Sequence, residues 1–398
     1  MIDNNSTPIG INMDEETLTT DNDGDDSESV ETERDGKKRK NTKLDLKKFK
    51  EEYDKMIDEN KWTLSCSGRK VEDVLYILCH SFVVDPWDTT YLTKSVFTKA
   101  EIDEIKTWKQ KGYPVPEEKC LQYLNQYKQI KNATEARRMI FKAQGWDEDF
   151  DRNTNHDLDW IRHSYYTMIR ELERGGVDDH TNSETWLLSH IWTSVDRVFD
   201  DMELYVLRGE NASAASSSRK NKERVPQGEE KLERKRMGRR LDMILRKKKL
   251  ELGGGEAGKE MDDNDAKLLR ERDIKLPKAL KDMMMMLKKE KGDIEGVRIA
   301  GLLQYGLKMT SITLDVPEKY AHRITRTQNV LVPYTFEDLP NFRKVLYMAL
   351  SNKAIVLDTL HLLSTPAQDE EVGYDDLSGV MEPPEEDSYQ LPDTFSSQ

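Results

Sequence analysis

Two strand-like segments joined by a short basic turn constrain the fold of this chain more than any other feature. The first segment, residues 240–246, places the carboxylate of Asp242 inside an apolar run. The second segment, residues 250–259, ends in a glycine-rich step that carries Glu256 and then Lys259. Short runs of this kind on either side of a turn are typical of a β-hairpin. Two acids and a lysine on neighbouring strands can hold a divalent metal and a phosphate.

The turn position predicts how the two acids face each other. If the turn is centred near Lys249, Asp242 and Glu256 lie opposite each other across an antiparallel pair. Facing Cβ atoms are then about 4.5–5.5 Å apart, which is close enough for both carboxylates to share one Mg²⁺. Without a partner the two acids repel each other, and one pKa rises. A metal ion or Lys259 would remove this repulsion.

This constellation resembles the catalytic signature of the restriction-endonuclease-like, PD-(D/E)xK, superfamily. Residues 181–332 predict a helix, three strands, a helix and then further strands, which is similar to the core of that superfamily. The resemblance implies that Glu184 is the acid of the first helix, Asp242 the strand acid and Glu256 the acid of E-x-K. It also implies Asp242 and Glu256 as Mg²⁺ ligands, with Glu184 assisting. More narrowly, residues 238–259 resemble uncharacterised fungal proteins with a degenerate nuclease-like core.

The lysine departs from the superfamily pattern. That pattern has lysine two residues after the acid, whereas this chain has Gly258 there and Lys259 one position later. Strict alternation puts Lys259 on the opposite strand face. A bulge at Gly258 would turn Lys259 back toward the acids. Without that bulge we expect the fold to persist and catalysis to be weak or lost.

The predicted fold class is α+β, with a helical N-terminal region followed by a restriction-endonuclease-like mixed sheet flanked by helices. Local signals support this order: Thr98 and Glu101 have the spacing of a capping box, Ser183 precedes an amphipathic helix, and Pro277 opens another. Residues 212–218 predict a loop, and residues 336–350 and 355–363 predict the last helical segments. The expected divisions are an acidic disordered tail with a basic cluster (1–42), a helical region (43–177), the nuclease-like domain (178–365) and a second acidic disordered tail (366–398).

Charge is distributed unevenly along the chain. The formal net charge is −14, but residues 1–35 hold twelve acids and one arginine, and residues 367–398 hold ten acids and no Lys or Arg. The remaining core is therefore roughly +7. Residues 219–249 alone carry fourteen Lys or Arg against five acids. Such a run is either a solvated face or a phosphate-binding surface. Its candidate nucleic-acid contacts are Arg234, Lys235, Arg236, Arg239 and Arg240.

Other features place the protein inside the cell. The three cysteines show no disulfide framework and no paired metal spacing, and the histidines show none either. No signal region or membrane span is expected. The cluster Lys37–Lys40 is either a nuclear-import signal, a nucleic-acid arm or the solvated start of a helix. We therefore expect an intracellular location, nuclear or cytoplasmic.

Three functions remain open from the sequence. The first is a Mg²⁺-dependent nuclease in which Lys259 orients water or stabilises phosphate charge. The second is a nucleic-acid-binding protein that keeps the fold without catalysis. The third is an interaction protein that binds protein partners through its helical region or acidic tails. The phosphate-loop, serine-hydrolase and zinc-protease motifs are absent from the sequence.

Overall fold

The computed structural model of the protein describes residues 46–78, 81–177, 179, 181–222, 234–259, 266–292 and 294–364. The two predicted acidic tails, the cluster Lys37–Lys40 and the basic residues between 223 and 233 lie outside these residues. None of the helices in the described part of the chain is long and apolar enough to cross a membrane.

The first half of the described chain is helical with one exception. Residues 46–54 are helical, and the helices that follow are η1 (Asp58–Asn60), α2 (Val71–Leu78), α3 (Thr90–Thr93), α4 (Lys99–Thr107), α5 (Glu118–Gln126), α6 (Ala133–Ile140) and α7 (Arg152–Arg174). The exception is the short strand β1 (Val83–Val84), which pairs in parallel with β7 (His322–Arg326). The N-terminal region therefore contributes a strand to the sheet of the second half.

The second half alternates helical and extended segments. A continuous helical stretch is made of α8 (Glu184–Leu187), η2 (Leu188–Trp192), α9 (Thr193–Asp196) and η3 (Arg197–Phe199). The later helices are α10 (Ala214–Lys220), α11 (Ala266–Arg270), η4 (Glu271–Lys275), α12 (Leu276–Lys291), η5 (Leu339–Asn341) and α13 (Phe342–Ser364). The strands are β2 (Tyr205–Ala212), β3 (Arg240–Lys247), β4 (Leu250–Gly258), β5 (Ile299–Tyr305), β6 (Lys308–Asp315), β7 and β8 (Val330–Leu331).

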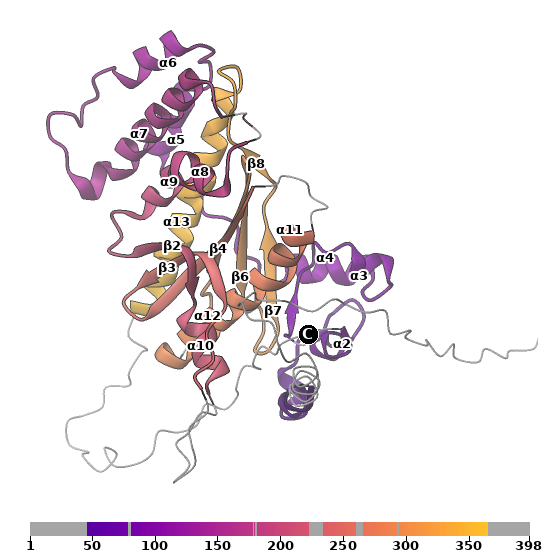
Figure 1. The fold of residues 1–398 in the computed structure, drawn as a ribbon. Coiled ribbons are helices and arrows are strands. Elements are labelled where there is room, and N and C mark those ends of the chain that lie inside the picture. The colour runs from indigo at the N-terminus through magenta and orange to yellow at the C-terminus, as the bar shows by residue number, and fades with distance from the viewer. Residues whose placement is uncertain are drawn as a thin grey trace, which may run out of the picture.

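Eight strands of the described residues form one mixed sheet, which confirms the predicted α+β class (Figure 1). The strand order is β1-β7-β6-β5-β4-β3-β2, and β8 pairs with β6. β2, β3 and β4 form an antiparallel meander, and β5 lies parallel to β4 after a crossover through α11, η4 and α12. The predicted order of helix, three strands, helix and strand is found except that a helix, α10, lies between the first and second of the three strands.

A bulge sets the register of the β3–β4 hairpin. Next to the turn, Lys247 pairs with Leu250 and Arg246 with Glu251, whereas Leu245 pairs with Gly253. Leu252 is therefore the extra residue on β4. Because side chains alternate between faces, this one-residue shift decides which β4 side chains share a face with those of β3.

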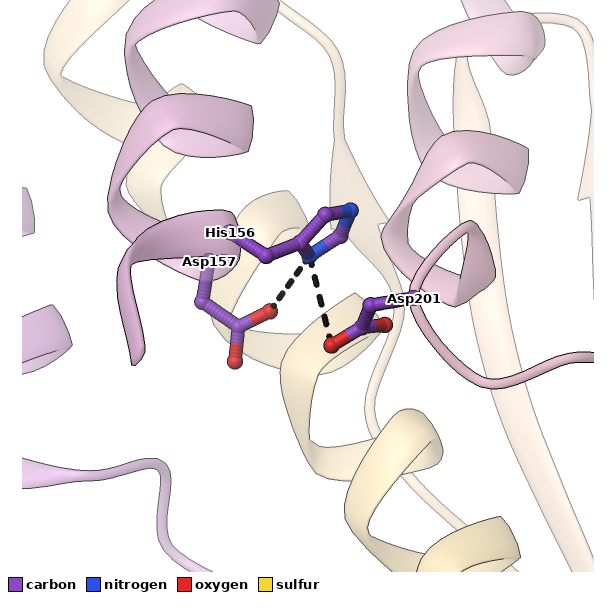
Figure 2. Close-up of side chains that lie close together, drawn as sticks. All are labelled: His156, Asp157 and Asp201. Atoms are coloured by element: carbon purple, nitrogen blue, oxygen red, sulfur yellow. Dashed lines mark hydrogen bonds and ion pairs between the residues drawn. The ribbon is translucent and has the colours of Figure 1, made fainter. Parts of the chain in front are cut away.

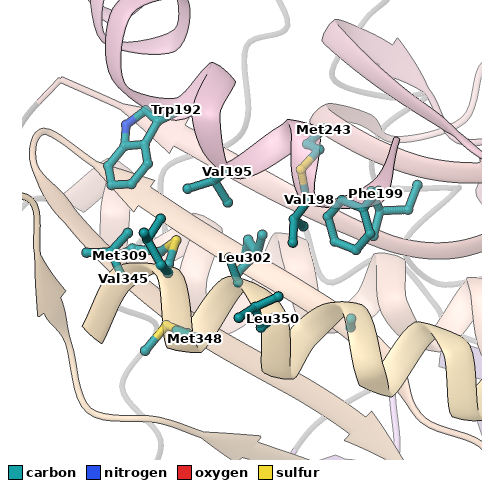
Figure 3. Packing of buried hydrophobic residues seen from close by; sticks show 14 of the residues in the cluster. Trp192, Val195, Val198, Phe199, Met243, Leu302, Met309, Val345, Met348 and Leu350 are labelled. Atoms are coloured by element: carbon teal, nitrogen blue, oxygen red, sulfur yellow. The ribbon is translucent and has the colours of Figure 1, made fainter. Parts of the chain in front are cut away.

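Helices cover both faces of the sheet. On one face, α13 and the stretch from η2 to η3 pack against the strands through residues that include Trp192, Phe199, Met243, Leu302 and Met348 (Figure 3). On the other face, α12 packs closely on β4 and β5. A Cβ on Gly254 would lie 2.9 Å from Leu241 and 3.3 Å from Met283, and one on Gly301 would lie 2.9 Å from Leu280. Glycines in these strands thus let α12 approach the sheet.

Buried apolar residues form two clusters. The smaller cluster holds residues between Phe49 and Ile105, together with Ala321. The larger cluster runs from Cys120 to Leu363 and joins α5, α6 and α7 to the sheet. The expected boundary between residues 177 and 178 falls inside this larger cluster, so the hydrophobic core extends across it.

Several local predictions are confirmed and two are wrong. Thr98 and Glu101 form a capping box, and Ser183 caps α8 by accepting a hydrogen bond from the Trp186 amide. The loop predicted at residues 212–218 is wrong, because Ser213 caps the helix α10 there. The two segments predicted after residue 336 are one helix, α13, which runs without interruption through residues 351–354.

Glu72 is a buried acid at the start of α2 within the smaller cluster. Its Oε2 accepts a hydrogen bond from the Trp62 amide at 2.8 Å, whereas its Oε1 has no hydrogen-bond partner. Burial raises the pKa of Glu72 to about 7, because it outweighs the hydrogen bonds that the backbone donates. The folded protein therefore binds this proton more tightly than the unfolded chain does.

Replacing Glu72 should change how stability depends on pH. The stabilising contribution of the proton is present below the usual pKa of 4.5 and is lost as pH rises through about 7. One pKa unit corresponds to about 1.4 kcal/mol. We therefore expect the free energy of unfolding of the wild-type protein to fall by an amount on the order of 1–3 kcal/mol across this pH window, and we expect this fall to be absent in Glu72→Gln. Urea unfolding at a series of pH values measures the effect. Glu148→Gln, at an exposed site, should keep the wild-type dependence, and an unchanged dependence in Glu72→Gln would contradict the assignment.

Candidate functional site

Asp242 of β3 and Glu256 of β4 lie on neighbouring strands toward the β2 edge of the sheet. The β3–β4 ladder ends at the pair Met243–Gly255, and Asp242 and Glu256 are the next residues beyond that pair. The Ala257 amide donates a hydrogen bond to Asp242 Oδ2 at 2.8 Å, which ties the Asp242 carboxylate to β4 beside Glu256. Asp242 is 9% exposed and Glu256 is fully buried. The bulge at Leu252 sets the register in which the two acids follow the same ladder pair.

Glu256 is the most strongly perturbed of these acids. Burial raises its pKa to about 9, the charges of Asp242 and Glu271 add to the rise, and Lys275 opposes it. Lys275 Nζ donates to Glu256 Oε2 at 2.8 Å, while Glu256 Oε1 is buried without a hydrogen-bond partner. One carboxylate oxygen at this position is therefore available to a further ligand.

The cation beside Glu256 comes from the crossover helix. Lys275 ends the π-helical segment η4, and Glu271 begins it. Lys275 Nζ lies 3.4 Å from Glu271 Oε1, and the Tyr305 hydroxyl donates to Glu271 Oε2. Although burial lowers the pKa of Lys275, Glu256 and Glu271 together raise it above its ordinary value. Segments of π-helix occur frequently at functional sites.

Glu184 joins the cluster from the other helical layer. Its position at the first turn of α8 is favourable for a carboxylate because of the helix dipole. Burial raises the pKa of Glu184, the charges of Asp242 and Glu271 add to this effect, and Lys267 of α11 opposes it from 3.5 Å. The structure thus brings Glu184, Asp242 and Glu256 into one electrostatic cluster.

Lys259 does not take part in this cluster. It is exposed just past the end of β4, and β4 pairs with β5 in unbroken register through Glu256, Ala257 and Gly258. The bulge that would turn Lys259 back toward the acids is therefore not formed. Gly258 leaves space for the ring of Tyr305, since a Cβ at Gly258 would lie 2.5 Å from Tyr305 Cε1. An aromatic ring thus fills the side-chain position that lysine has in the superfamily pattern.

A side chain at position 258 should disturb the site. Gly258→Ala forces the Tyr305 ring to move, and overpacking of this kind costs about 1–3 kcal/mol. We expect that loss in the free energy of unfolding, measured in urea. Gly112→Ala is the control, because no atom lies within 4 Å of its added Cβ. Equal stability of the two variants would show that the ring is not confined.

Sequence reasoning missed Glu271, Lys275, Lys267 and Tyr305. One signal was present: Glu271 and Lys275 are four residues apart on the helix that follows the Glu256 strand. That spacing puts two side chains on one helix face. Nothing in the sequence pairs Tyr305 with Gly258, because that contact depends on the parallel register of β4 and β5.

The predicted nucleic-acid contacts lie immediately before Asp242. Arg234, Lys235, Arg236 and Arg240 are exposed, and Arg239 is partly buried. The backbone of Arg236 is tied to the end of α10 by two hydrogen bonds with the Asn221 side chain, each 2.8 Å long. Arg240 also pairs with Glu210 at 3.3 Å. Strand alternation puts Arg240 on the same face of β3 as Asp242.

A separate cluster of possible metal ligands contains His156, Asp157 and Asp201 (Figure 2). In the described part of the chain, these three side chains are the His, Cys, Asp or Glu residues that bring at least three possible ligand atoms within 4.8 Å of one another. Lys353 Nζ donates to Asp157 Oδ1 and Asp201 Oδ2 at 2.6 Å each, so a buried ammonium already bridges the two acids and offsets one of their two negative charges. This arrangement joins α13 to the start of α7 and to the residues after η3. It is best explained as a structural ion pair.

Comparisons with known proteins add no further constraint on the site. No family model, curated protein or solved structure matches the chain.

Proposed function

We propose that the protein is a Mg²⁺-dependent phosphodiesterase that acts on nucleic acid, with Asp242 and Glu256 as metal ligands. The observation that carries this proposal is the placement of the two acids on the neighbouring strands β3 and β4, where the Asp242 carboxylate is hydrogen-bonded to the Ala257 amide next to Glu256, with a Glu256 oxygen that has no hydrogen-bond partner and a lysine beside it. Burying two acids of like charge near each other costs free energy of folding. Titratable groups whose pKa values are strongly shifted are concentrated at functional sites. The order of the helices and strands around Asp242 and Glu256 supports the same proposal.

The residues present fit a Mg²⁺ ion. Mg²⁺ is usually bound through one or two carboxylates, and water and substrate phosphate oxygens complete its coordination. Asp242 and Glu256 supply two carboxylates, and Glu184 approaches from α8. When bound, the ion would polarise the phosphate and lower the pKa of a bound water. The carboxyl groups of Glu184, Asp242 and Glu256 do not lie within 4.8 Å of one another as a set, so we assign two direct ligands.

Lys275 takes the role that the sequence suggested for Lys259. Its ammonium is held beside Glu256 by charge, and it approaches the acids from the helix side. A cation placed there stabilises the negative charge that develops on phosphate oxygens. The exposed basic residues 234–240 would hold the nucleic-acid backbone near Asp242, since lysines and arginines supply most phosphate affinity.

Metal binding should depend on Asp242. We expect Mn²⁺ or Mg²⁺ to raise the melting temperature of the wild-type protein, because a ligand that binds only the folded state stabilises it. Asp242→Asn should remove this metal-dependent shift and abolish cleavage of labelled DNA and RNA. Differential scanning fluorimetry and gel assays provide the two readouts. Asp149→Asn, an exposed control, should behave as wild type in both.

The two lysines give the sharper test of the active site. Lys275→Met removes the cation beside Glu256, and we expect the cleavage rate to fall by about 10²-fold or more, as after loss of one electrostatic stabiliser. Lys259→Met should leave the rate unchanged. Single-turnover cleavage, with melting curves to verify folding, measures both. A slower rate in Lys259→Met together with an unchanged rate in Lys275→Met would contradict this assignment and identify Lys259 as the catalytic lysine.

A second candidate function is nucleic-acid binding without catalysis. It is favoured by the internal neutralisation of the acid cluster, in which Lys267 pairs with Glu184 and Lys275 with Glu256. A wild-type protein that binds nucleic acid but cleaves neither single- nor double-stranded substrates with Mg²⁺ or Mn²⁺ would replace the first proposal with this one.

A further inference from the structure

A cavity of about 480 Å³ lies between α5, the first half of α13 and the segment that joins β7 to β8. This volume is within the range of about 300–1,000 Å³ that holds small-molecule ligands. Its apolar walls come from Tyr113, Leu121, Leu124, Val330, Tyr347 and Met348. Apolar walls of this kind favour the hydrocarbon part of a ligand over water.

The charged residues of the cavity are all cationic. Arg343 and Lys344, in the first turn of α13, belong to its lining, and none of the described residues that line it is acidic. Lys344 is exposed, and the half-buried guanidinium of Arg343 donates one long hydrogen bond, 3.3 Å, to Asn125. An anionic group is therefore complementary to this end of the cavity.

A second polar group lies further along the same helix. Ser351 lines the cavity, is 2% exposed, and its hydroxyl has no hydrogen-bond partner. A buried polar atom without a partner is costly, so a ligand that supplies one is stabilised. Ser351 lies seven positions after Lys344 and eight after Arg343, which corresponds to about 10–12 Å of helix. The two polar positions are thus separated by an apolar interval.

We propose that this cavity binds a small apolar carboxylate whose acid group pairs with Lys344 and Arg343 and whose far end hydrogen-bonds to Ser351. The fitting ligand class is a medium-chain carboxylic acid with a polar group at its opposite end. This site is separate from the acid cluster at Asp242 and Glu256 and does not depend on the proposed phosphodiesterase activity.

Isothermal titration of the full chain tests the proposal, with decanoate, ω-hydroxydecanoate and decanol as probes below their aggregation concentrations. We expect saturable one-to-one binding of both acids. Decanol should bind at least about fivefold more weakly, because one charge-assisted contact contributes on the order of 1 kcal/mol or more. Absence of saturable binding of the acids, or equal binding of decanol, would overturn the proposal.

Three variants locate the site. Lys344→Glu reverses the charge and should weaken decanoate binding, whereas the exposed control Lys94→Glu should not. Ser351→Ala should remove the preference for ω-hydroxydecanoate over decanoate, about three- to tenfold for one hydrogen bond. Val330→Trp should block the cavity, with melting curves to verify folding. Wild-type affinity in Lys344→Glu, or an unchanged preference in Ser351→Ala, would place the ligand elsewhere and contradict the assignment.

Discussion

The burial of Glu256 next to a second acid, Asp242, is the constraint on which the rest of the site depends. Asp242 and Glu256 follow the same ladder pair, Met243–Gly255, because Leu252 adds a residue to β4. Without that bulge, the regular ladder would pair Asp242 with Gly255. The bulge therefore creates an electrostatic problem that the surrounding elements must solve. A charge buried without a partner is far more costly than a local irregularity in a strand.

The crossover between β4 and β5 supplies that solution. A parallel pair requires a long connection over one face of the sheet, and here the connection is α11, η4 and α12. The face that α12 covers also carries the ring of Tyr305, which packs on Gly258. The same connection delivers Lys275 to Glu256 and Lys267 to Glu184. The connection that allows β5 to run parallel to β4 is thus also the segment that carries the two compensating lysines.

Much of this arrangement could be predicted from local patterns. The hairpin, the helices and strands on either side of it and the capping residues Thr98 and Ser183 all follow from short-range sequence signals, whereas the bulge at Leu252, which sets the register of Asp242 and Glu256, does not. The pairing of β1 with β7 could not be predicted, because it joins a two-residue strand to a segment more than 200 residues away. α10 was missed because a run of alanine and serine suits a loop as well as a helix, and Ser213 with Glu251 decides between them through buried hydrogen bonds. The role of Lys353 depends on tertiary contacts in the same way.

The position of the lysine shows why a strand motif was an incomplete guide to the site. An electrostatic role requires a positive charge at a point in space, and the field of an ammonium is the same whether a strand or a helix carries it. Gly258 leaves no side chain on β4 at that point, and Tyr305 fills the space from β5. Tyr305 in turn donates to Glu271, one turn before Lys275 on the crossover helix. The glycine, the tyrosine and the helical glutamate and lysine therefore form one connected arrangement, in which the lysine beside Glu256 comes from the helix and not from the strand.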